Sequence, residues 1–449
     1  MKTPHLRLRA LVATVLATAG ELHSQSPKPS HDPLNIILIM ADDSAADNYG
    51  CYGSTFFSTP RLDALAAGGA RFAHCYATPL CTPSRVKLMT GRDGIRNYVR
   101  FGTLDRSEVT FGTMMQDAGY ATAIAGKWQL HGDPQGSLAP ECGFETHCLW
   151  NYPGTDRTRY WKPSIVRDGE LLATTDDDYG PDLFTDFIIE FIAKNQSRPF
   201  FAYYPMVLVH SPFLPTPDSA PTTAGADEGS DLSHYRDMTA YADKCVGRIV
   251  DALDQHGMRD RTVLIYTTDN GTGRRLTYPY RGESRQGEKA LATDGGTHAP
   301  LIVHCPGAVP PGIVSDDLVD FSDVLPTLAE ISGAVLPDVE LDGRSFWPQC
   351  QGAPGNPREW IFQYYYPKLA RAADAHGQGV NNLEVAWAQN QQYKLYRDGT
   401  LYEVLDRHEA APLEPGTSPR ADAARVLLQA AFDSMPQHAA KLSPPDRAR

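Results

Sequence analysis

Four apolar runs, each closely followed by polar residues, constrain the fold of this chain more than any other feature. They span residues 34–40, 121–125, 200–204 with a continuation at 206–209, and 262–268. Continuous apolar character of this kind is typical of parallel strands covered on both faces. The polar residues that follow are Asp42 and Asp43, Lys127, His210, and Asp269 with Asn270. Because ligands of open α/β sheets bind outside the carboxyl ends of the strands, these side chains are predicted to converge on one site.

Helical patterns fall between these runs. Residues 59–66 combine a Thr-Pro pair, typical of a helix start, with an apolar stripe. From 235 to 253 apolar residues recur at helical spacing, and Gly257 follows as a stop. Residues 212–231 predict a long loop, which is either a lid or a plain surface excursion.

The alternation of strands and helices ends near residues 341–344. Beyond it, short runs at 360–366, 384–387, 393–396 and 401–405 predict a meander of strands, and residues 421–435 predict a closing helix. We therefore expect an α/β fold with a large, mostly parallel or mixed sheet flanked by helices, followed by a smaller antiparallel sheet with a helix. The predicted boundaries are 34–345, 356–435, and 436–449 for a frayed tail.

Residues 1–19 are predicted to be a secretory signal peptide. Three basic residues precede a short apolar run at 10–16, and Ala17-Thr18-Ala19 offers a cleavage site. A membrane anchor is the alternative, but this apolar run is much shorter than the about 20 apolar residues needed to span a bilayer core. Cleavage takes the formal charge from −13 to −16. So acidic a chain lacks the positive surface that nucleic acids require. We expect a secreted or periplasmic protein that binds neither nucleic acid nor membrane.

The chain has eight cysteines, and export would permit disulfides. Cys142 and Cys148 are the best candidate pair because a short loop could close between them, although spacing alone does not prove the bond. No CxxC pair or Cys/His cluster indicates a zinc site.

Cys81 precedes a predicted short helix, with Thr82 as its cap, Pro83 in its first turn and Gly91 as its stop. The free N–H groups and the dipole at a helix start favour an anion there. Arg85 lies one turn on, along the same side, and can form two hydrogen bonds to nearby oxygens. By themselves these residues fit a thiolate of depressed pKa or a structural anion site.

The run Cys81-Thr-Pro-Ser-Arg85, followed by Thr90-Gly91, resembles the signature of the formylglycine-dependent sulfatases, which belong to the alkaline phosphatase-like superfamily. Other segments are also similar to that family and occur in its order: 41–43, 59–77, 126–128, 269–271, 294–300 and 324–328. The ordered series is far more specific than the five-residue signature alone. The resemblance covers roughly residues 34–345, and the C-terminal meander is similar to the family's small domain.

The resemblance implies that a separate maturation enzyme, the formylglycine-generating enzyme or an anaerobic counterpart, oxidises Cys81 to formylglycine (3-oxoalanine). One hydroxyl of the hydrated aldehyde would attack sulfur and expel the substrate alcohol, and the other would allow sulfate release. Residue 81 and four others match the family's metal ligands: Asp42, Asp43, Asp269 and Asn270. A carboxylate-rich, all-oxygen set favours calcium, one ion of which is expected.

Three further residues match family positions. Lys127 resembles the sulfate-binding lysine, His210 the histidine near the leaving-group oxygen, and Lys289 the second lysine. With Arg85, these side chains would neutralise the transferring sulfuryl group and protonate the departing alcohol.

One position departs from the family pattern. Many members have histidine after Gly-Lys-Trp, where this chain has Gln129. Glutamine forms hydrogen bonds but does not accept a proton at neutral pH. Our hypothesis is that His131, on the same face of an extended chain, supplies the base, or that Gln129 only positions the diol.

A basic segment follows the second acidic pair and contains Arg274, Arg275, Arg281 and Arg285, with Tyr278 and Tyr280 between them. It would either bind further sulfates or a carboxylate while tyrosines contact sugar rings, or form a solvated loop. We therefore expect a sulfuric ester hydrolase acting on a sulfated carbohydrate. The alternatives are a phosphatase or phosphonate monoester hydrolase on the same fold, and an inactive secreted sugar-binding relative.

Overall fold

The computed structural model describes residues 33–130, 139–152, 154, 156–219, 231–366, 384–405, 408–409 and 411–440. The described residues all belong to one compact unit. The predicted signal peptide at 1–19 lies outside the described residues, as does most of the predicted 212–231 loop. Among the described helices, none has the length and apolar character that crossing a membrane requires.

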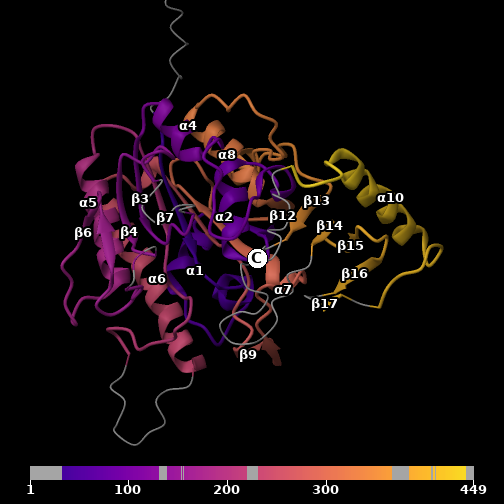
Figure 1. Ribbon diagram of the computed structural model, residues 1–449, viewed down its shortest axis with the longest axis horizontal. Helices are drawn as coiled ribbons and strands as arrows, with labels where there is room; N and C mark the ends of the chain where they lie inside the picture. The colour runs from indigo at the N-terminus through magenta and orange to yellow at the C-terminus, as the bar shows by residue number, and fades with distance from the viewer. Residues whose placement is uncertain are drawn as a thin grey trace, which may run out of the picture. The chain divides into compact units, whose positions relative to one another are not determined.

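The core of the molecule is a ten-stranded sheet with the order β12-β2-β11-β8-β1-β7-β3-β4-β5-β6 (Figure 1). The bounds are β1 Asn35–Ala41, β2 Ala70–Tyr76, β3 Ala121–Gly126, β4 Thr146–Trp150, β5 Ile165–Arg167, β6 Glu170–Leu171, β7 Phe200–Pro205, β8 Thr262–Thr268, β11 His298–His304 and β12 Ile313–Asp320. Strands β8, β1, β7, β3 and β4 are mutually parallel. Strand β11 runs antiparallel to its two neighbours. The predicted mixed sheet is thus confirmed.

The predicted strand continuation at 206–209 is wrong. The segment is irregular, although it follows the end of β1 closely. The Met206 N–H donates to the Met40 carbonyl at 2.8 Å, and the Val209 N–H donates to the Asp42 carbonyl at 2.8 Å. The apolar run therefore reflects burial against β1 rather than strand geometry, and it still delivers His210 to the edge of the sheet.

Helices cover both faces of this sheet. One layer contains α1 (Pro60–Ala67), α5 (Gly180–Lys194) and α6 (Asp231–Gln255), and the other contains α2 (Cys81–Thr90), α4 (Phe111–Asp117), α8 (Val324–Ser332) and the short α9 (Trp347–Cys350). Ile37 and Ile39 of β1 face the first layer, while Ile36 and Leu38 face the second. Burial on both sides explains the continuous apolar runs in the sequence. The helices predicted at 59–66 and 235–253 are α1 and α6.

The predicted Cys142–Cys148 disulfide is not formed, and all eight cysteines are free. Cys148 lies in β4 and faces the core beneath α5 and α6. Cys142 packs in the core on the other face of the sheet. Because the two thiols are buried on opposite sides of the sheet, the short loop between them does not bring them together.

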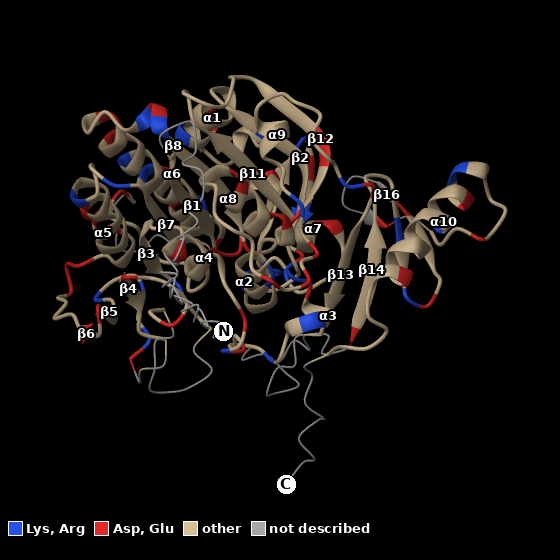
Figure 2. Ribbon diagram, turned by 90° about the horizontal axis from the view of Figure 1, so that it is seen from above, with Lys and Arg blue, Asp and Glu red and all other residues tan. Residues whose placement is uncertain are grey.

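The predicted C-terminal meander is confirmed. Its strands are β13 Ile361–Tyr365, β14 Val385–Gln389, β15 Tyr393–Tyr396, β16 Leu401–Leu405 and β17 His408–Glu409, and the closing helix is α10 Pro419–Ser434. Neighbouring strands are antiparallel. This small sheet lies beside β12 and the short α7 (Asp294–Thr297) (Figure 2). At the start of the predicted tail, the Ala440 N–H donates to the Ile95 carbonyl at 2.8 Å, so the chain is held there.

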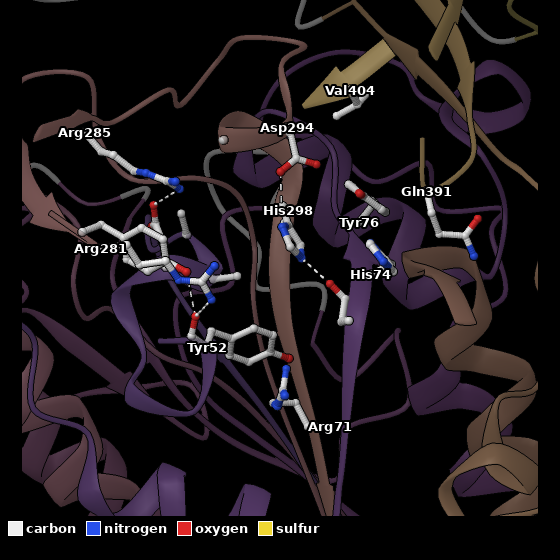
Figure 3. A pocket seen from close by; sticks show the side chains of 16 residues that line it. Tyr52, Arg71, His74, Tyr76, Arg281, Arg285, Asp294, His298, Gln391 and Val404 are labelled. Carbon is white, nitrogen blue, oxygen red and sulfur yellow. Dashed lines mark hydrogen bonds and ion pairs between the residues drawn. The ribbon is translucent and has the colours of Figure 1, made fainter. Parts of the chain in front are cut away.

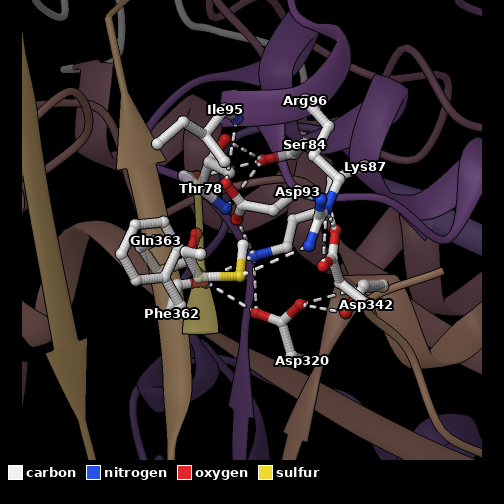
Figure 4. Close-up of polar contacts among 12 residues, drawn as sticks. Thr78, Ser84, Lys87, Asp93, Ile95, Arg96, Asp320, Asp342, Phe362 and Gln363 are labelled. Atoms are coloured by element: carbon white, nitrogen blue, oxygen red, sulfur yellow. Dashed lines mark hydrogen bonds and ion pairs between the residues drawn. The ribbon is translucent and has the colours of Figure 1, made fainter. Parts of the chain in front are cut away.

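A buried lysine ties α2 to the small sheet (Figure 4). The Lys87 amine lies 2.8 Å from an Asp320 carboxylate oxygen and 2.9 Å from one of Asp93, and it donates to the Phe362 carbonyl of β13 at 3.0 Å. Burial disfavours the charged amine, but the two carboxylates more than offset this and raise the pKa of Lys87. Helix α2 and the small sheet are therefore coupled through one charge.

Replacing this lysine tests the coupling. We expect Lys87→Met to lower the free energy of unfolding by about 3–5 kcal/mol, because it leaves two buried carboxylates without their cation. Lys244→Met is the control, since the pair of Lys244 with Asp218 is exposed and should contribute less than about 1 kcal/mol. Urea denaturation of both variants measures the difference. Equal losses would show that the Lys87 pairing is unimportant.

Candidate active site

Three buried carboxylates meet at the carboxyl ends of β1 and β8. Asp42 and Asp43 follow β1, and Asp269 follows β8. Each offers an oxygen atom, and these oxygens lie within 4.8 Å of one another. Asp42 and Asp269 are 0% exposed and Asp43 is 5% exposed. The predicted convergence of these two strand ends is thus present, and it concentrates negative charge away from water.

Three cations neutralise this acidic cluster of Asp42, Asp43 and Asp269. The Lys127 amine donates to the two Asp42 carboxylate oxygens at 2.8 and 2.6 Å. The Lys289 amine donates to Asp43 at 2.6 Å, and an Arg85 Nη donates to Asp269 at 2.8 Å. Each carboxylate therefore has its own cationic partner, supplied by a different segment of the chain.

The pKa values of the carboxyl groups diverge within the cluster. Burial opposes the charge of Asp42, but Lys127 and Arg85 outweigh it and lower the pKa of that carboxyl. Burial and the adjacent Asp42 raise the pKa of Asp269 to about 7. Asp269 is therefore the carboxyl whose ionised form burial disfavours most, and a bound cation would favour that ionised form.

Asn270 supplies a fourth oxygen. Its amide nitrogen donates to an Asp43 carboxylate oxygen at 2.9 Å. Its Oδ1 atom is buried and has no hydrogen-bond partner among the described residues. A buried carbonyl oxygen without a donor beside three carboxylates is a fitting ligand for a hard cation. The donor set therefore fits calcium or a similar ion.

Helix α2 begins two residues earlier than predicted: Leu80 rather than Thr82 is the cap, so Cys81 is the first helical residue instead of preceding the cap. Pro83 lies in the first turn and Gly91 ends the helix, as predicted, and Gly91 has the left-handed conformation (φ 67°). Cys81 is 2% exposed, and burial raises the pKa of its thiol although Lys127 and Lys289 oppose this. A thiolate of depressed pKa is therefore not what this environment produces.

The loop before Cys81 is tied to the rest of the site. The Ser84 hydroxyl accepts from the Thr78 N–H at 3.0 Å and donates to the Thr78 carbonyl at 3.0 Å. The Ala290 N–H donates to the Pro79 carbonyl at 2.9 Å, which joins the Lys289 segment to this loop. Besides Asp269, Arg85 donates to the Lys127 carbonyl at 2.6 Å.

His210 is half-buried at the rim of the cluster. Its Nε2 lies 3.7 Å from an Asp43 oxygen, and its Nδ1 is 2.6 Å from the Ser211 carbonyl oxygen. Burial lowers the pKa of the imidazole to about 3, even though Asp43 opposes this. The ring is therefore neutral, with Nδ1–H donating to Ser211 and Nε2 directed toward the acidic cluster.

Of the two residues considered for deprotonation of the diol, only Gln129 lies among the described residues. Gln129 is buried, has φ 53°, and its side-chain oxygen has no hydrogen-bond partner among the described residues. This free acceptor is consistent with a positioning role. His131 lies outside the described residues, so its predicted role stays a prediction.

One neighbour of the site carries no sequence motif. Tyr365 of β13 packs in an apolar cluster with Leu80 and Ala290, which flank Cys81 and Lys289 in the chain. It is 2% exposed, and its hydroxyl has no partner among the described residues. Only the topology of the small sheet brings this residue to the site, so no sequence signal could have identified it.

Comparisons with known proteins agree with this geometry. The sulfatase family model matches residues 34–334. Arylsulfatase A of Homo sapiens is 34% identical over 379 aligned residues, which cover 76% of this chain and 73% of that protein.

Solved structures share the fold. A Bacteroides thetaiotaomicron protein described in the metabolism of multiple glycosaminoglycans has a TM-score of 0.67 at 24% identity, covering 90% of this chain and 99% of its own. A protein in complex with its substrate D-glucosamine-2-N,6-O-disulfate has a TM-score of 0.69 at 20% identity, covering 90% and 98%. The phosphonate monoester hydrolase of Silicibacter pomeroyi has a TM-score of 0.67 at 21% identity, covering 91% and 97%.

The family model covers two-thirds of the chain, and the human relative exceeds 30% identity over most of both proteins. The chain therefore belongs to the sulfatase family of sulfuric ester hydrolases.

Proposed function

We propose that this protein removes sulfate from a sulfated carbohydrate, using a formylglycine formed from Cys81 and one bound calcium ion. The observation that carries the proposal is the position of Cys81. It starts a buried helix next to the acidic cluster, in electrostatic contact with the two lysines that pair with that cluster. A buried cysteine surrounded by metal-type oxygens and amines fits conversion to an oxygen nucleophile better than thiol chemistry.

The calcium ligands would be Asp42, Asp43, Asp269 and the Asn270 amide oxygen, with residue 81 beside them. The four protein side chains offer only oxygen atoms, as calcium requires. The ion supplies Lewis-acid stabilisation of sulfate oxygens and lowers the pKa of a neighbouring hydroxyl, and formylglycine supplies a hydroxyl pair.

The chain's own cations would hold the sulfate. Lys127 and Lys289 reach the cluster from two different segments, and anionic substrate oxygens would attract both amines. Arg85 is committed to Asp269 and to the Lys127 carbonyl, so it would hold the site in place rather than contact substrate. His210 would donate a proton from Nε2 to the departing alcohol oxygen, once the nearby anionic substrate favours its charged form.

Regeneration of the site needs a proton acceptor near residue 81. Gln129 offers a buried acceptor oxygen that can orient a hydroxyl but does not take a proton. His131 would take that proton. Gln129 would thus orient the hydroxyl, and His131 would accept its proton.

A carbohydrate substrate is favoured over a small aryl sulfate by two observations. The fold neighbours include a protein solved with a disulfated glucosamine and one from glycosaminoglycan metabolism. The basic segment at 274–285 also lies close to Lys289 in the chain. A phosphonate monoester hydrolase shares the fold equally well, so the reaction must be tested directly.

The reaction is tested with a matched sulfate and phosphonate monoester of one alcohol. We expect the protein from its natural host to hydrolyse the sulfate faster by at least about 100-fold, because the site is built for a transferring sulfuryl group. Mass spectrometry of the peptide that contains Cys81 should find an aldehyde in place of the thiol.

Cys81→Ala is the matched inactive variant and should remove activity toward both esters. Preference for the phosphonate would favour the rival hydrolase. Only unmodified cysteine in active protein would rule out formylglycine, and an unmodified protein without activity would point to a sugar-binding relative.

Calcium binding is tested by thermal stability, which needs no activity. At a calcium concentration about 100 times Kd, binding should stabilise the fold by about 2.7 kcal/mol and raise Tm. Asp269→Asn should abolish this shift. Asp243→Asn should retain it, because Asp243 is a buried carboxylate that caps α1 away from the cluster. No shift in the wild type would argue against a calcium site.

The roles of Gln129 and His131 are separable by kinetics. His131→Ala should lower kcat by about 100-fold or more and remove one limb of the pH profile, because a general base is lost. Gln129→Ala should lower kcat with the pH profile kept. If His131→Ala leaves both turnover and pH profile unchanged, His131 is not the base. A much faster Gln129→His variant would show that the wild type lacks an efficient one.

A further inference from the structure

A cavity of about 260 Å³, whose lining side chains are drawn in Figure 3, lies outside the acidic cluster. Its walls come from β2, β11, the hairpin of β9 (Thr277–Tyr280) and β10 (Glu283–Gln286), and the segment 45–47, and the small sheet contributes one side. Segment 45–47 begins two residues after Asp43. Gly295, also in the wall, contacts Gly271 so closely that a Cβ there would lie 2.0 Å from the Gly295 carbonyl oxygen. The cavity therefore borders the cluster without including any of its members.

Two arginines in this wall have no acidic partner among the described residues. The guanidinium of Arg71 lies over the ring of Tyr52, 4.9 Å from its centre. Arg281 donates to the Tyr52 carbonyl oxygen at 3.4 Å and packs against Gly53. Figure 3 shows the two guanidinium groups on either side of the Tyr52 side chain. Both groups keep donors available for an incoming anion.

The other charges of the wall are compensated. Arg285 lies 3.5 Å from a carboxylate oxygen of Asp47. His298 faces Asp294 through Nδ1 at 3.3 Å and donates from Nε2 to the Ala73 carbonyl at 2.8 Å. With both ring nitrogens placed against oxygen acceptors, His298 is held as a cation beside its own carboxylate. The cavity therefore carries a net positive charge that comes from Arg71 and Arg281.

Flat rings complete the wall. The Tyr280 ring packs under Arg285 at 4.2 Å, and the Tyr76 ring stacks on His298 at 5.3 Å between centres. Guanidinium groups form paired hydrogen bonds to sulfate or carboxylate, so charge rather than ring stacking is what this wall offers to a ligand. Of the four arginines in the basic segment at 274–285, Arg281 and Arg285 line this cavity, whereas Arg274 and Arg275 do not.

We propose that this cavity binds an anionic sugar unit through Arg71 and Arg281, next to the unit whose sulfate is removed. The inference rests on the proposed function for the identity of the reacting unit and extends it: the substrate is an oligosaccharide with negative charge on more than one unit. The charge recognised is a sulfate or a uronate carboxylate, since both match a guanidinium in the same way.

Direct binding tests the cavity without turnover. The full-length Cys81→Ala protein is titrated calorimetrically with a panel of tetrasaccharides: sulfated with uronate, sulfated with reduced carboxyls, desulfated with uronate, and neutral. We expect Arg71→Gln and Arg281→Gln each to weaken binding of a charged tetrasaccharide about tenfold, or about 1.4 kcal/mol. Arg275→Gln, on the same segment but outside the cavity, should leave Kd unchanged. Comparison across the panel identifies the charge that is read.

Arg281 is exposed, so its variant should fold even if Arg71→Gln does not, and Tm values check both. The proposal is overturned if no charged tetrasaccharide binds, or if binding is indifferent to both arginines. Failure of the proposed sulfatase activity would give a different result. The wild type would then hydrolyse neither the tetrasaccharide nor an aryl sulfate, while tetrasaccharide binding would still depend on the two arginines. If the protein both hydrolyses the sulfate and binds an anionic sugar in this cavity, the arginine variants should lower kcat/KM for the tetrasaccharide but not for a small aryl sulfate.

Discussion

The rest of the structure depends on the burial of three carboxylates within 4.8 Å of one another. Removing a charge from water costs several kcal/mol per ion unless partners replace the water. Here Asp42 pairs with Lys127 after β3, Asp43 with Lys289, and Asp269 with Arg85 on α2. The cluster is therefore buried at low cost only when these segments are all in place. These ion pairs, which would also take part in catalysis, therefore help to fix the position of α2 against the centre of the sheet.

The small C-terminal sheet takes part in this framework. On one side, Lys87 of α2 donates to the Phe362 carbonyl of β13. On the other, Lys394 of β15 donates to the Ala292 carbonyl, three residues after Lys289. The buried amine of Lys394 also lies over the ring of Trp387, which packs near Leu80. Both the helix that begins with Cys81 and the segment that carries Lys289 are thus held from the same small sheet.

Sequence patterns predicted the parts of the molecule whose environment is uniform along several residues. The strands that precede Asp42 and Asp269 are buried on both faces, so their continuous apolar runs identified them. The run at 206–209 shows the limit of this argument, because an irregular segment packed along β1 is equally apolar. Cys142 and Cys148 show another limit: closeness in sequence says nothing about which face of a sheet each side chain takes.

The candidate site divides in the same way. Lys127 and Asp269 were predictable because each directly follows a strand, and Cys81 because it lies at a helix start within a family signature. Tyr365 and Arg71 were not, because their positions depend on how the small sheet and the edge strands pack. Such contacts between distant segments leave no local periodicity, and only the assembled fold brings them to one place.

Charge placement also reconciles an acidic protein with an anionic substrate. The chain carries a formal charge of −13, which would repel a polyanion at long range. At about 0.15 M salt this repulsion is screened beyond about 8 Å, whereas contacts inside a cavity are screened much less. Recognition must therefore come from local cations that the protein's own carboxylates do not neutralise. Arg71 and Arg281 satisfy that condition, and Lys127 and Lys289 would satisfy it if the proposed metal cation took over their carboxylate partners.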